Sequence, residues 1–322
     1  MQRTDNLTLE KLCSPALWAE GPVWLPEQDA VVFSDVKGNR MFRWQRSGEV
    51  SLWRSPSHYA NGNARDLQGR VVSCEHGRRA ISRTEHDGSV TLLVEKVDGK
   101  RFNSPNDVVV RSDGTIWFTD PPYGIVSDDE GYHAHSQVIG CYLYCFDPIA
   151  QRLTIAASDL QRPNGLAFSP DESLLYVADM SVVDFPTLGR RQLRVYPVDG
   201  HELGSGRLFA EVAPGFPDGF CVDAQGYLYC SCADGVIIYD SKGMPCGKIP
   251  LPERVSNCTL GGPHGNELYI TATTSLYRVT PALARQGLPG SRILLLPAFA
   301  RPESGGCASD HRTQHYFYLT VL

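Results

Sequence analysis

Six residues that open similar stretches of this sequence carry side-chain oxygens, and together they have the chemistry of a metal site. Carboxylate and amide oxygens are the ligands that hard divalent cations such as Ca²⁺, Mg²⁺ and Mn²⁺ prefer. Asn and Asp also favour turns, which would account for Asn61 and Asn257, but Glu is not a turn former. Because two carboxylates would neutralise a divalent cation, we interpret the set as metal ligands. Its members are Glu20, Asn61, Asn106, Asn164, Asp218 and Asn257.

The stretches that these residues open form a repeat. Each continues through a short apolar run, a polar turn and an alternating strand, as in "NDVVVRSDGTIWFTD" from Asn106 and "NGLAFSPDESLLYVAD" from Asn164. The units start 39 to 58 residues apart, further strand-like runs fill the gaps, and helical periodicity is almost absent. About four short strands per unit, in six units, predict an all-β, six-bladed β-propeller with equivalent residues at one end of a central channel. A two-sheet sandwich is the alternative, but it does not predict six like units.

The composition of the chain argues against several classes of function. The net charge is −6 and no basic block is present, which argues against nucleic acid or an acidic membrane surface as the main partner. The N-terminal segment lacks the apolar core of a signal peptide, and no apolar run approaches the roughly 18 residues of a membrane helix. We therefore expect a cytoplasmic protein. Its ten cysteines are expected to be mainly buried thiols, because four of them, Cys141, Cys145, Cys230 and Cys232, lie inside strand-like runs.

A second set of residues ends the alternating strands and includes four acids. Strand ends usually face solvent, but Asp120 precedes the rigid sequence "PPYG", so we expect it to line the channel mouth. A lid is predicted over residues 119–137, beside Asn106. His76, at another strand end, is a candidate hydrogen-bonding residue of the channel. The four acids are Asp35, Glu75, Asp120 and Asp179.

Several motifs, taken in order, identify a family resemblance. They are "EGPVW", "RFNSPNDVVVRSDGTIWFTDPPYG", "RPNGLAFSPDESLLYVAD" and "PDGFCVDAQGYLYC". Over roughly residues 15–280 the chain resembles the gluconolactonase and senescence marker protein (regucalcin) family. The resemblance implies a six-bladed propeller with one catalytic divalent cation in its channel.

The resemblance also implies roles for individual residues. Glu20, Asn164 and Asp218 match metal ligands of the family, and Asp218 matches its proposed general acid/base. Asn106 matches a position that binds metal in some members and substrate in others, and Arg101 matches a substrate-contacting arginine. Asn103 competes with Asn106 for one role, and the repeat favours Asn106.

The resemblance, together with the oxygen ligands of the six units, implies metal-dependent hydrolysis of a sugar lactone to its aldonic acid. Ca²⁺ is the favoured cation, and Zn²⁺, Mn²⁺, Mg²⁺ and Fe²⁺ are alternatives. Either Asp218 or a metal-activated water would act as base, and Arg101, Asn106, Asp120 and Tyr123 would contact the substrate. The alternative functions are a phosphotriester or organofluorophosphate hydrolase at the same metal, or a metal-binding propeller without activity.

The expected organisation is one propeller domain over residues 1–322. Residues 281–322 contain strand-like runs, one of which is expected to help the N-terminal segment close the ring.

Overall fold

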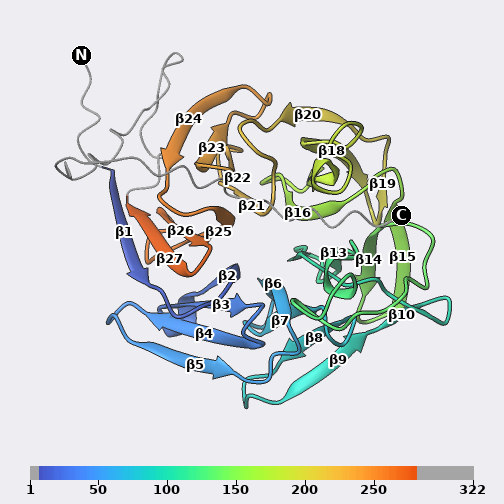
Figure 1. The fold of residues 1–322 in the computed structure, drawn as a ribbon, viewed down its shortest axis with the longest axis horizontal. Helices are drawn as coiled ribbons and strands as arrows, with labels where there is room; N and C mark the ends of the chain where they lie inside the picture. Colours follow the sequence, from blue (N-terminus) through green and yellow to red (C-terminus); the bar gives the residue numbers. More distant parts are fainter. Residues whose placement is uncertain (1–6, 281–322) are drawn as a thin grey trace, which may run out of the picture.

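Six antiparallel sheets surround a central axis in the computed structural model, which describes residues 7–280 (Figure 1). The predicted six-bladed β-propeller is confirmed. In blades 1 to 5 the chain starts at the axis and runs outward, so the first strand of each blade lines the channel. Loops and the turns at strand ends then place side chains at the two channel mouths.

The strands of the first three blades follow the chain in order. Blade 1 consists of β2 (Ala19–Leu25), β3 (Ala30–Asp35), β4 (Arg40–Gln45) and β5 (Val50–Arg54). Blade 2 consists of β6 (Ala60–Arg65), β7 (Val71–Glu75), β8 (Ala80–Thr84) and β9 (Val90–Val94). Blade 3 consists of β12 (Val108–Val110), β13 (Ile116–Thr119), β14 (Leu143–Asp147) and β15 (Arg152–Ala157).

Blades 4 and 5 repeat this order, and blade 6 borrows its outer strand. Blade 4 consists of β16 (Pro163–Phe168), β17 (Leu174–Asp179), β18 (Gln192–Asp199) and β20 (Arg207–Glu211), with the short β19 (Glu202–Leu203) paired to the end of β18. Blade 5 consists of β21 (Phe220–Val222), β22 (Leu228–Cys232), β23 (Gly235–Tyr239) and β24 (Pro245–Pro250). Blade 6 consists of β25 (Val255–Gly261), β26 (Glu267–Ala272), β27 (Ser275–Thr280) and β1 (Thr8–Cys13).

The N-terminal strand closes the ring. β1 pairs antiparallel with β27, with Thr8 opposite Thr280, so the two ends of the described chain complete one sheet. β1 is the outermost strand of this sheet, so hydrogen bonds between the first and last described strands hold the ring closed. The predicted contribution of residues 281–322 to closure lies outside the described residues.

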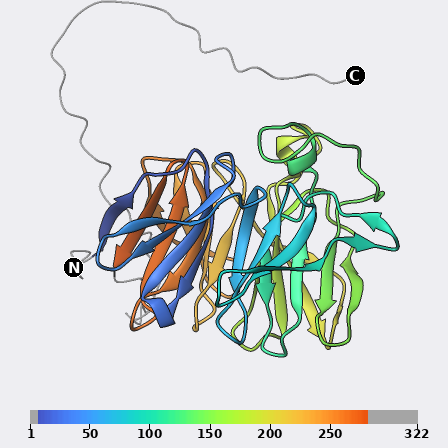
Figure 2. The same cartoon turned by 90° about the horizontal axis from the view of Figure 1, so that it is seen from below.

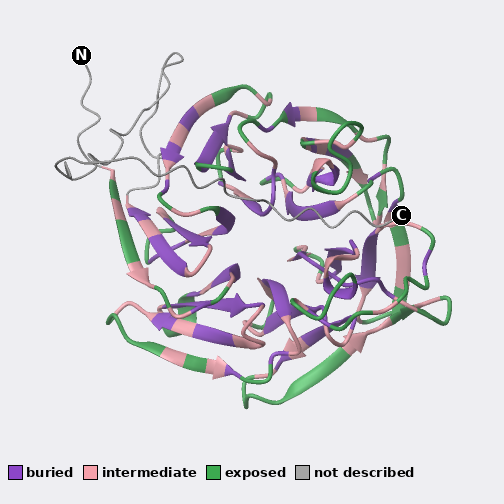
Figure 3. Ribbon diagram, viewed as in Figure 1, coloured by how far each residue is buried: buried purple, intermediate pink, exposed green. Residues whose placement is uncertain are grey.

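The core lies between neighbouring blades. Large side chains such as Trp117, Tyr144 and Tyr229 are fully buried there, and apolar clusters join each blade face to the next. The outermost strands are more exposed, as β5 and β9 show (Figure 3). Burial therefore falls from the axis outward, and polar side chains buried near the axis need a specific reason.

Long connections rise from one face of the ring, on the side where β13 and β17 end (Figure 2). The predicted lid, residues 119–137, falls almost wholly in the connection from β13 to β14, which contains the 3₁₀ turn η2 (Tyr123–Ile125). The connection from β17 to β18 contains η3 (Ser181–Val183), and η1 (Pro26–Gln28) follows β2. A two-stranded hairpin, β10 (Lys96–Val97) with β11 (Lys100–Arg101), precedes blade 3.

Within residues 7–280 no helix has the length and apolar character needed to span a bilayer. The cytoplasmic location stays a prediction.

Candidate active site

Hydrogen bonds join each blade to the next at the level of the six opening residues, which we call the ring residues. All six are buried, with at most 7% of their surface exposed. Each bond involves a ring residue or a residue near one, so the structure brings all six to one level around the axis. In order, the bonds run from Ser34 Oγ to Asn61 O, Gly62 N to Asn106 O, Thr119 Oγ1 to Asn164 O, Gly165 N to Asp218 O, Gly219 N to Ser256 O and Ser256 Oγ to Ala19 O, over 2.7 to 3.1 Å.

Local backbone irregularity directs the ring side chains. In four blades the pairing register of the innermost strand shifts at or beside the ring residue, for example between Glu20 and Val23. Such bulges turn a strand and re-aim its side chains. Gly21 has a φ of +47°, and a Cβ there would collide with the carbonyl oxygen of Asn61. Glycine after the ring residue thus permits both the bulge and the close approach of blade 2.

Two buried carboxylates of the ring, those of Glu20 and Asp218, interact electrostatically. Burial raises the pKa of Glu20, and the nearby charges of Asp218 and Asp107 raise it further. Burial likewise raises the pKa of Asp218, while Arg254 and a hydrogen bond from Asn164 oppose this shift. Two carboxylates so placed are unfavourable as a pair of free anions, because each is desolvated and repels the other.

The donor set at the ring suits a hard divalent cation. Glu20 and Asp218 supply two negative charges, and Asn106 and Asn164 supply amide oxygens at the same level. Within the described residues no three His, Cys, Asp or Glu side chains gather to hold a metal ion. A cation here would therefore depend on amide oxygens as well as carboxylates, which is typical of Ca²⁺ rather than Zn²⁺.

A bridge across the axis forms the floor of the ring. The Asn257 amide of blade 6 donates to Asp107 Oδ2 of blade 3 over 3.3 Å, and it also hydrogen-bonds Glu20. Beyond this bridge lies a cavity of about 480 Å³ lined by the innermost strands of all six blades. Asn257 and Asp107 both line that cavity, so Asn257 belongs to the ring and to the cavity wall.

The lid reaches across the ring from blade 3. Lys37 of blade 1 forms an ion pair with Asp129 at 2.5 Å, and the rings of Tyr59 and Tyr132 meet edge to face. The carboxylate of Glu130 interacts electrostatically with Asp218, which precedes blade 5, and with Arg254, which precedes blade 6. The lid therefore covers the end of the channel that carries the ring residues.

Tyr123 and Arg101, both predicted to contact substrate, lie in different surroundings, and only Tyr123 interacts with a ring residue in the described chain. The Tyr123 hydroxyl is buried and has no hydrogen-bond partner within residues 7–280. Burial and the charges of Asp184 and Asp218 raise the pKa of Tyr123. The Arg101 guanidinium donates to the carbonyl oxygen of Arg78, 2.5 Å away, and its Nε has no partner among the described residues.

The acids at the strand ends are buried, so the expectation that Asp35, Glu75 and Asp179 face solvent was wrong. Asp35 accepts the backbone N–H groups of Leu17 and Trp18, and Asp179 accepts those of two residues just before β16. These N–H groups belong to residues just before the innermost strands, where they are away from water and need hydrogen-bond acceptors.

Asp120 occupies the equivalent position in blade 3. Its Oδ2 accepts the N–H of Asn103 over 2.8 Å, and its Oδ1 is buried without a partner in the described chain. Burial raises the pKa of Asp120 to about 7. Substrate contact by Asp120 stays a prediction.

The structure separates the two candidate amides of the "RFNSPND" segment. Asn103 donates to the carbonyl oxygens of Asp120 and Gly140 and accepts from Ser136 at 2.5 Å, so its amide joins the start of blade 3 to the lid connection. Asn106 lies in the ring. This placement favours Asn106 over Asn103 as a ligand.

Three charged residues near the ring were missed in the sequence. Asp107 follows a ring residue directly, and strand alternation would turn it away from the channel. Glu130 comes to the mouth through the lid, and no sequence pattern signals its position. Arg254 precedes blade 6 and lies against the rings of Trp18 and Phe216, at 5.6 and 4.8 Å from their centroids.

His76 is fully buried between the ring and the lid, as the sequence interpretation allowed. Its Nε2 lies 3.2 Å from the Asn61 amide nitrogen, and its Nδ1 lies 3.0 Å from the carbonyl oxygen of Glu130. Burial lowers the pKa of His76 to about 4. These two bonds suit a neutral ring that accepts at Nε2 and donates from Nδ1.

We expect this buried histidine to reduce stability in mild acid. Between pH 6.5 and 4 His76 is protonated in the unfolded chain but not in the folded chain, so the free energy of unfolding falls as pH falls. From pH 7.5 to 5 the wild type should lose about 2 kcal/mol more than His76→Gln. Urea unfolding at both pH values measures the difference, and an equal loss in both proteins would contradict the prediction.

Comparisons with known proteins agree with this fold. Residues 18–274 match the SMP-30/Gluconolactonase/LRE-like region. The chain is 32% identical to a gluconolactonase of Zymomonas mobilis over 84% of this chain and 80% of that protein. It is 27% identical to a 6-deoxy-6-sulfogluconolactonase of Pseudomonas putida over 80% of this chain and 84% of that protein. The solved structure of a gluconolactonase from Xanthomonas campestris superimposes with a TM-score of 0.81 and 41% identity, covering 86% of this chain and 90% of that one. The chain therefore belongs to the SMP-30/gluconolactonase/LRE-like family.

Proposed function

We propose that this protein is a lactonase that hydrolyses a sugar lactone to its aldonic acid with the help of one divalent cation. The observation that carries the proposal is the pair of desolvated carboxylates, Glu20 and Asp218, in a ring of amides beneath a lid. Similarity to gluconolactonases of known sequence and structure supports the substrate class.

The metal ligands in this proposal are Glu20, Asn106, Asn164 and Asp218. A divalent cation bound there would polarise the lactone carbonyl and stabilise negative charge on its oxygen. The Asn164 amide nitrogen donates to Met180 Sδ and to Asp218, which leaves the amide oxygen for the cation. Ca²⁺ is the cation that we favour, because all four ligands offer oxygen.

Asp218 is the proposed proton acceptor from the attacking water. Burial raises the pKa of its carboxyl group, the charge of Arg254 lowers it and the charge of Glu130 raises it. Because these two charges have opposite effects, a change in the position or charge of either neighbour would change the basicity of the Asp218 carboxylate. The lid keeps bulk water from the ring, which strengthens every interaction with developing charge.

Arg101, Asn106, Asp120 and Tyr123 are the proposed substrate contacts. Tyr123 has a buried hydroxyl without a partner, which a lactone oxygen or hydroxyl would satisfy. Arg101 and Asp120 each hold one unpartnered polar atom in the described chain, Nε and Oδ1. Substrate binding would thus satisfy groups that are costly to leave buried and unpaired.

A direct test is a pH-indicator assay of aldonolactone opening on chelator-stripped protein, with cations added back one at a time. We expect gluconolactone opening above the spontaneous rate with at least one cation, Ca²⁺ first. Rates that equal spontaneous opening with every cation, in folded protein, would reject the proposal.

Replacing Tyr123 by Phe tests the role of its hydroxyl. We expect kcat/KM to fall by about tenfold, since a substrate hydrogen bond is lost, without loss of stability, because that hydroxyl lacks a protein partner. Tyr132→Phe is the matched control, because that lid tyrosine is 53% exposed and its ring contact is kept. Equal kcat/KM in the two variants would contradict the assignment.

A further inference from the structure

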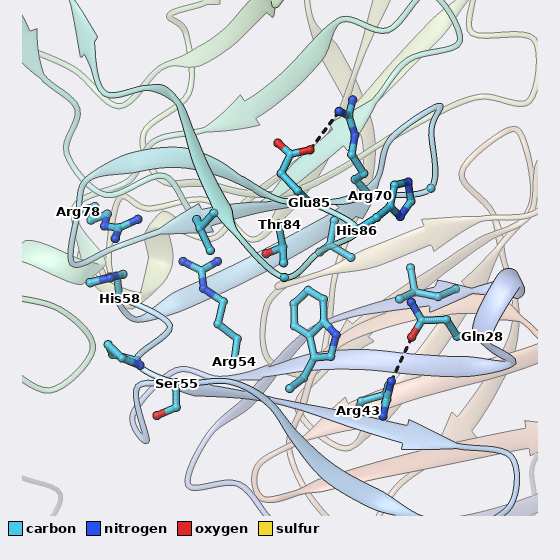
Figure 4. A pocket seen from close by; sticks show the side chains of 17 residues that line it. Gln28, Arg43, Arg54, Ser55, His58, Arg70, Arg78, Thr84, Glu85 and His86 are labelled. Atoms are coloured by element: carbon cyan, nitrogen blue, oxygen red, sulfur yellow. Dashed lines mark hydrogen bonds and ion pairs between the residues drawn. The ribbon is translucent and has the colours of Figure 1, made fainter.

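A second cavity, of about 500 Å³, lies between blades 1 and 2 and away from the ring (Figure 4). Its wall includes residues of the outer strands β4 and β5 on one side and β8 and β9 on the other, and most of the remaining lining residues lie in the connections of blades 1 and 2. The cavity beneath the ring is instead lined by the innermost strands. The two cavities are therefore separate sites, and no role proposed above uses the outer one.

Positive charge exceeds negative charge in this cavity. Arg54 and Arg78 both pair with one buried carboxylate, Glu75, and Arg78 does so over 3.5 Å. Arg43 bonds the Gln28 side chain at 3.4 Å and has no carboxylate partner in residues 7–280. Two of these three guanidinium groups thus share one carboxylate and the third has none, in a chain whose net charge is −6.

One titratable neighbour of these arginines, His58, is affected by their charge in addition to burial. Burial, together with Arg78 and Arg54, lowers the pKa of His58, although Glu75 opposes the shift. Figure 4 shows His58, Arg54 and Arg78 toward one side of the cavity and Arg43 toward the other. The fourth arginine of the wall, Arg70, is already neutralised by Asp66 and Glu85 at 2.7 and 3.1 Å.

Two buried donors of the wall have no protein partner. Thr84 is 7% exposed, and its Oγ1 makes no hydrogen bond within the described chain; the same holds for Arg43 Nε. Figure 4 places Thr84 between the two arginine groups. A donor left buried and unpaired is destabilising, and an oxygen acceptor from a ligand would remove that cost.

The rest of the wall suits the body of a small organic molecule. Trp53, Leu25, Val71 and Val90 add aromatic and aliphatic surface to the same cavity. Its volume lies in the range of ordinary ligand sites, roughly 300–1,000 Å³. Apolar surface beside a few convergent polar groups is the usual composition of such sites.

We propose that this cleft binds a small organic oxyanion, a sugar phosphate or a sugar acid. Arg43 and Arg54 bind its anionic oxygens, Thr84 donates to one of them, and the carbon skeleton lies on Trp53. Arginine suits this role because its guanidinium presents a planar array of donors that matches carboxylate and phosphate oxygens.

Isothermal titration calorimetry on the full chain tests the proposal, with glucose 6-phosphate, gluconate and neutral glucose as probes. We expect saturable binding of at least one anion, weaker at high salt, and none of glucose. Binding of the phosphate alone identifies a phosphorylated ligand, and binding of gluconate alone identifies a sugar acid. Absence of saturable binding of both anions at millimolar concentration would overturn the proposal.

Two variants locate the site. Arg43→Gln should weaken binding by about tenfold, and it leaves no carboxylate unpaired. Thr84→Val keeps the shape of the wall and should weaken binding to a smaller extent. Arg207→Gln is the matched control, because it removes the same charge from an exposed position on β20. Unchanged affinity in Arg43→Gln, as in Arg207→Gln, would move the anion to another site and overturn the proposal.

Discussion

Replacing Asp218 by Asn is expected to lower kcat/KM for lactone opening by at least about a thousandfold. The substitution keeps the shape of the side chain but removes one of the two ring carboxylates and the proposed proton acceptor. Folding should survive, because the backbone of Asp218 is held by Gly165 and by Ser231 Oγ at 2.8 Å, and neither bond uses the carboxylate. Steady-state rates in the pH-indicator assay, with near-ultraviolet circular dichroism to check the fold, measure the effect.

The control for this loss is Asp199→Asn. That substitution removes the same charge from an exposed residue at the end of β18, so activity should stay at the wild-type level. If kcat/KM of Asp218→Asn falls by tenfold or less, Asp218 is neither a metal ligand nor the base of the reaction. Loss of activity in both variants would show that net charge, rather than the ring, controls the reaction.

The architecture could be predicted because its signals are local. Each blade repeats one pattern of turn and strand, so six like stretches sufficed to give six blades. The ring residues could be found for the same reason, since each stands at a fixed place in its unit. Glu20 was the most informative member, because a glutamate at a position otherwise held by Asn and Asp is not explained by turn formation.

Contacts distant in sequence could not be predicted. Ring closure by β1 depends on pairing between Thr8 and Thr280, and nothing in "TLEKLC" specifies that partner. Glu130 reaches Asp218 only through the path of the lid. Asp107 meets Asn257 from the opposite blade, so its place in the channel depends on the whole ring being assembled.

The buried strand-end acids show a different limit. Asp35 and Asp179 resemble solvent-facing residues in sequence, but the loops before the inner strands need acceptors for their N–H groups. A carboxylate can accept several such bonds, which explains acids at blade positions far from any chemistry. Asp120 has this structural contact as well, so its type alone does not distinguish a role in substrate binding.

Adding Ca²⁺ to chelator-stripped protein is expected to raise the melting temperature by about 4–5 °C at a concentration of roughly 100 times Kd. Glu20 and Asp218 are desolvated and repel one another, and a bound cation would turn this repulsion into attraction. The expected gain, about 2.7 kcal/mol, follows from binding to the folded state alone. Differential scanning calorimetry with and without the cation measures it, and excess chelator should reverse it.

A double variant, Glu20→Gln with Asp218→Asn, separates binding at the ring from general salt effects. It should melt higher than cation-free wild type, because the repulsion is gone, and Ca²⁺ should no longer shift its melting temperature. K⁺ at matched ionic strength serves as the second control, since screening alone would stabilise both proteins alike. An equal Ca²⁺ shift in the wild type and the double variant would place the cation elsewhere. No shift with any divalent cation would mean that the two carboxylates are accommodated by protonation instead.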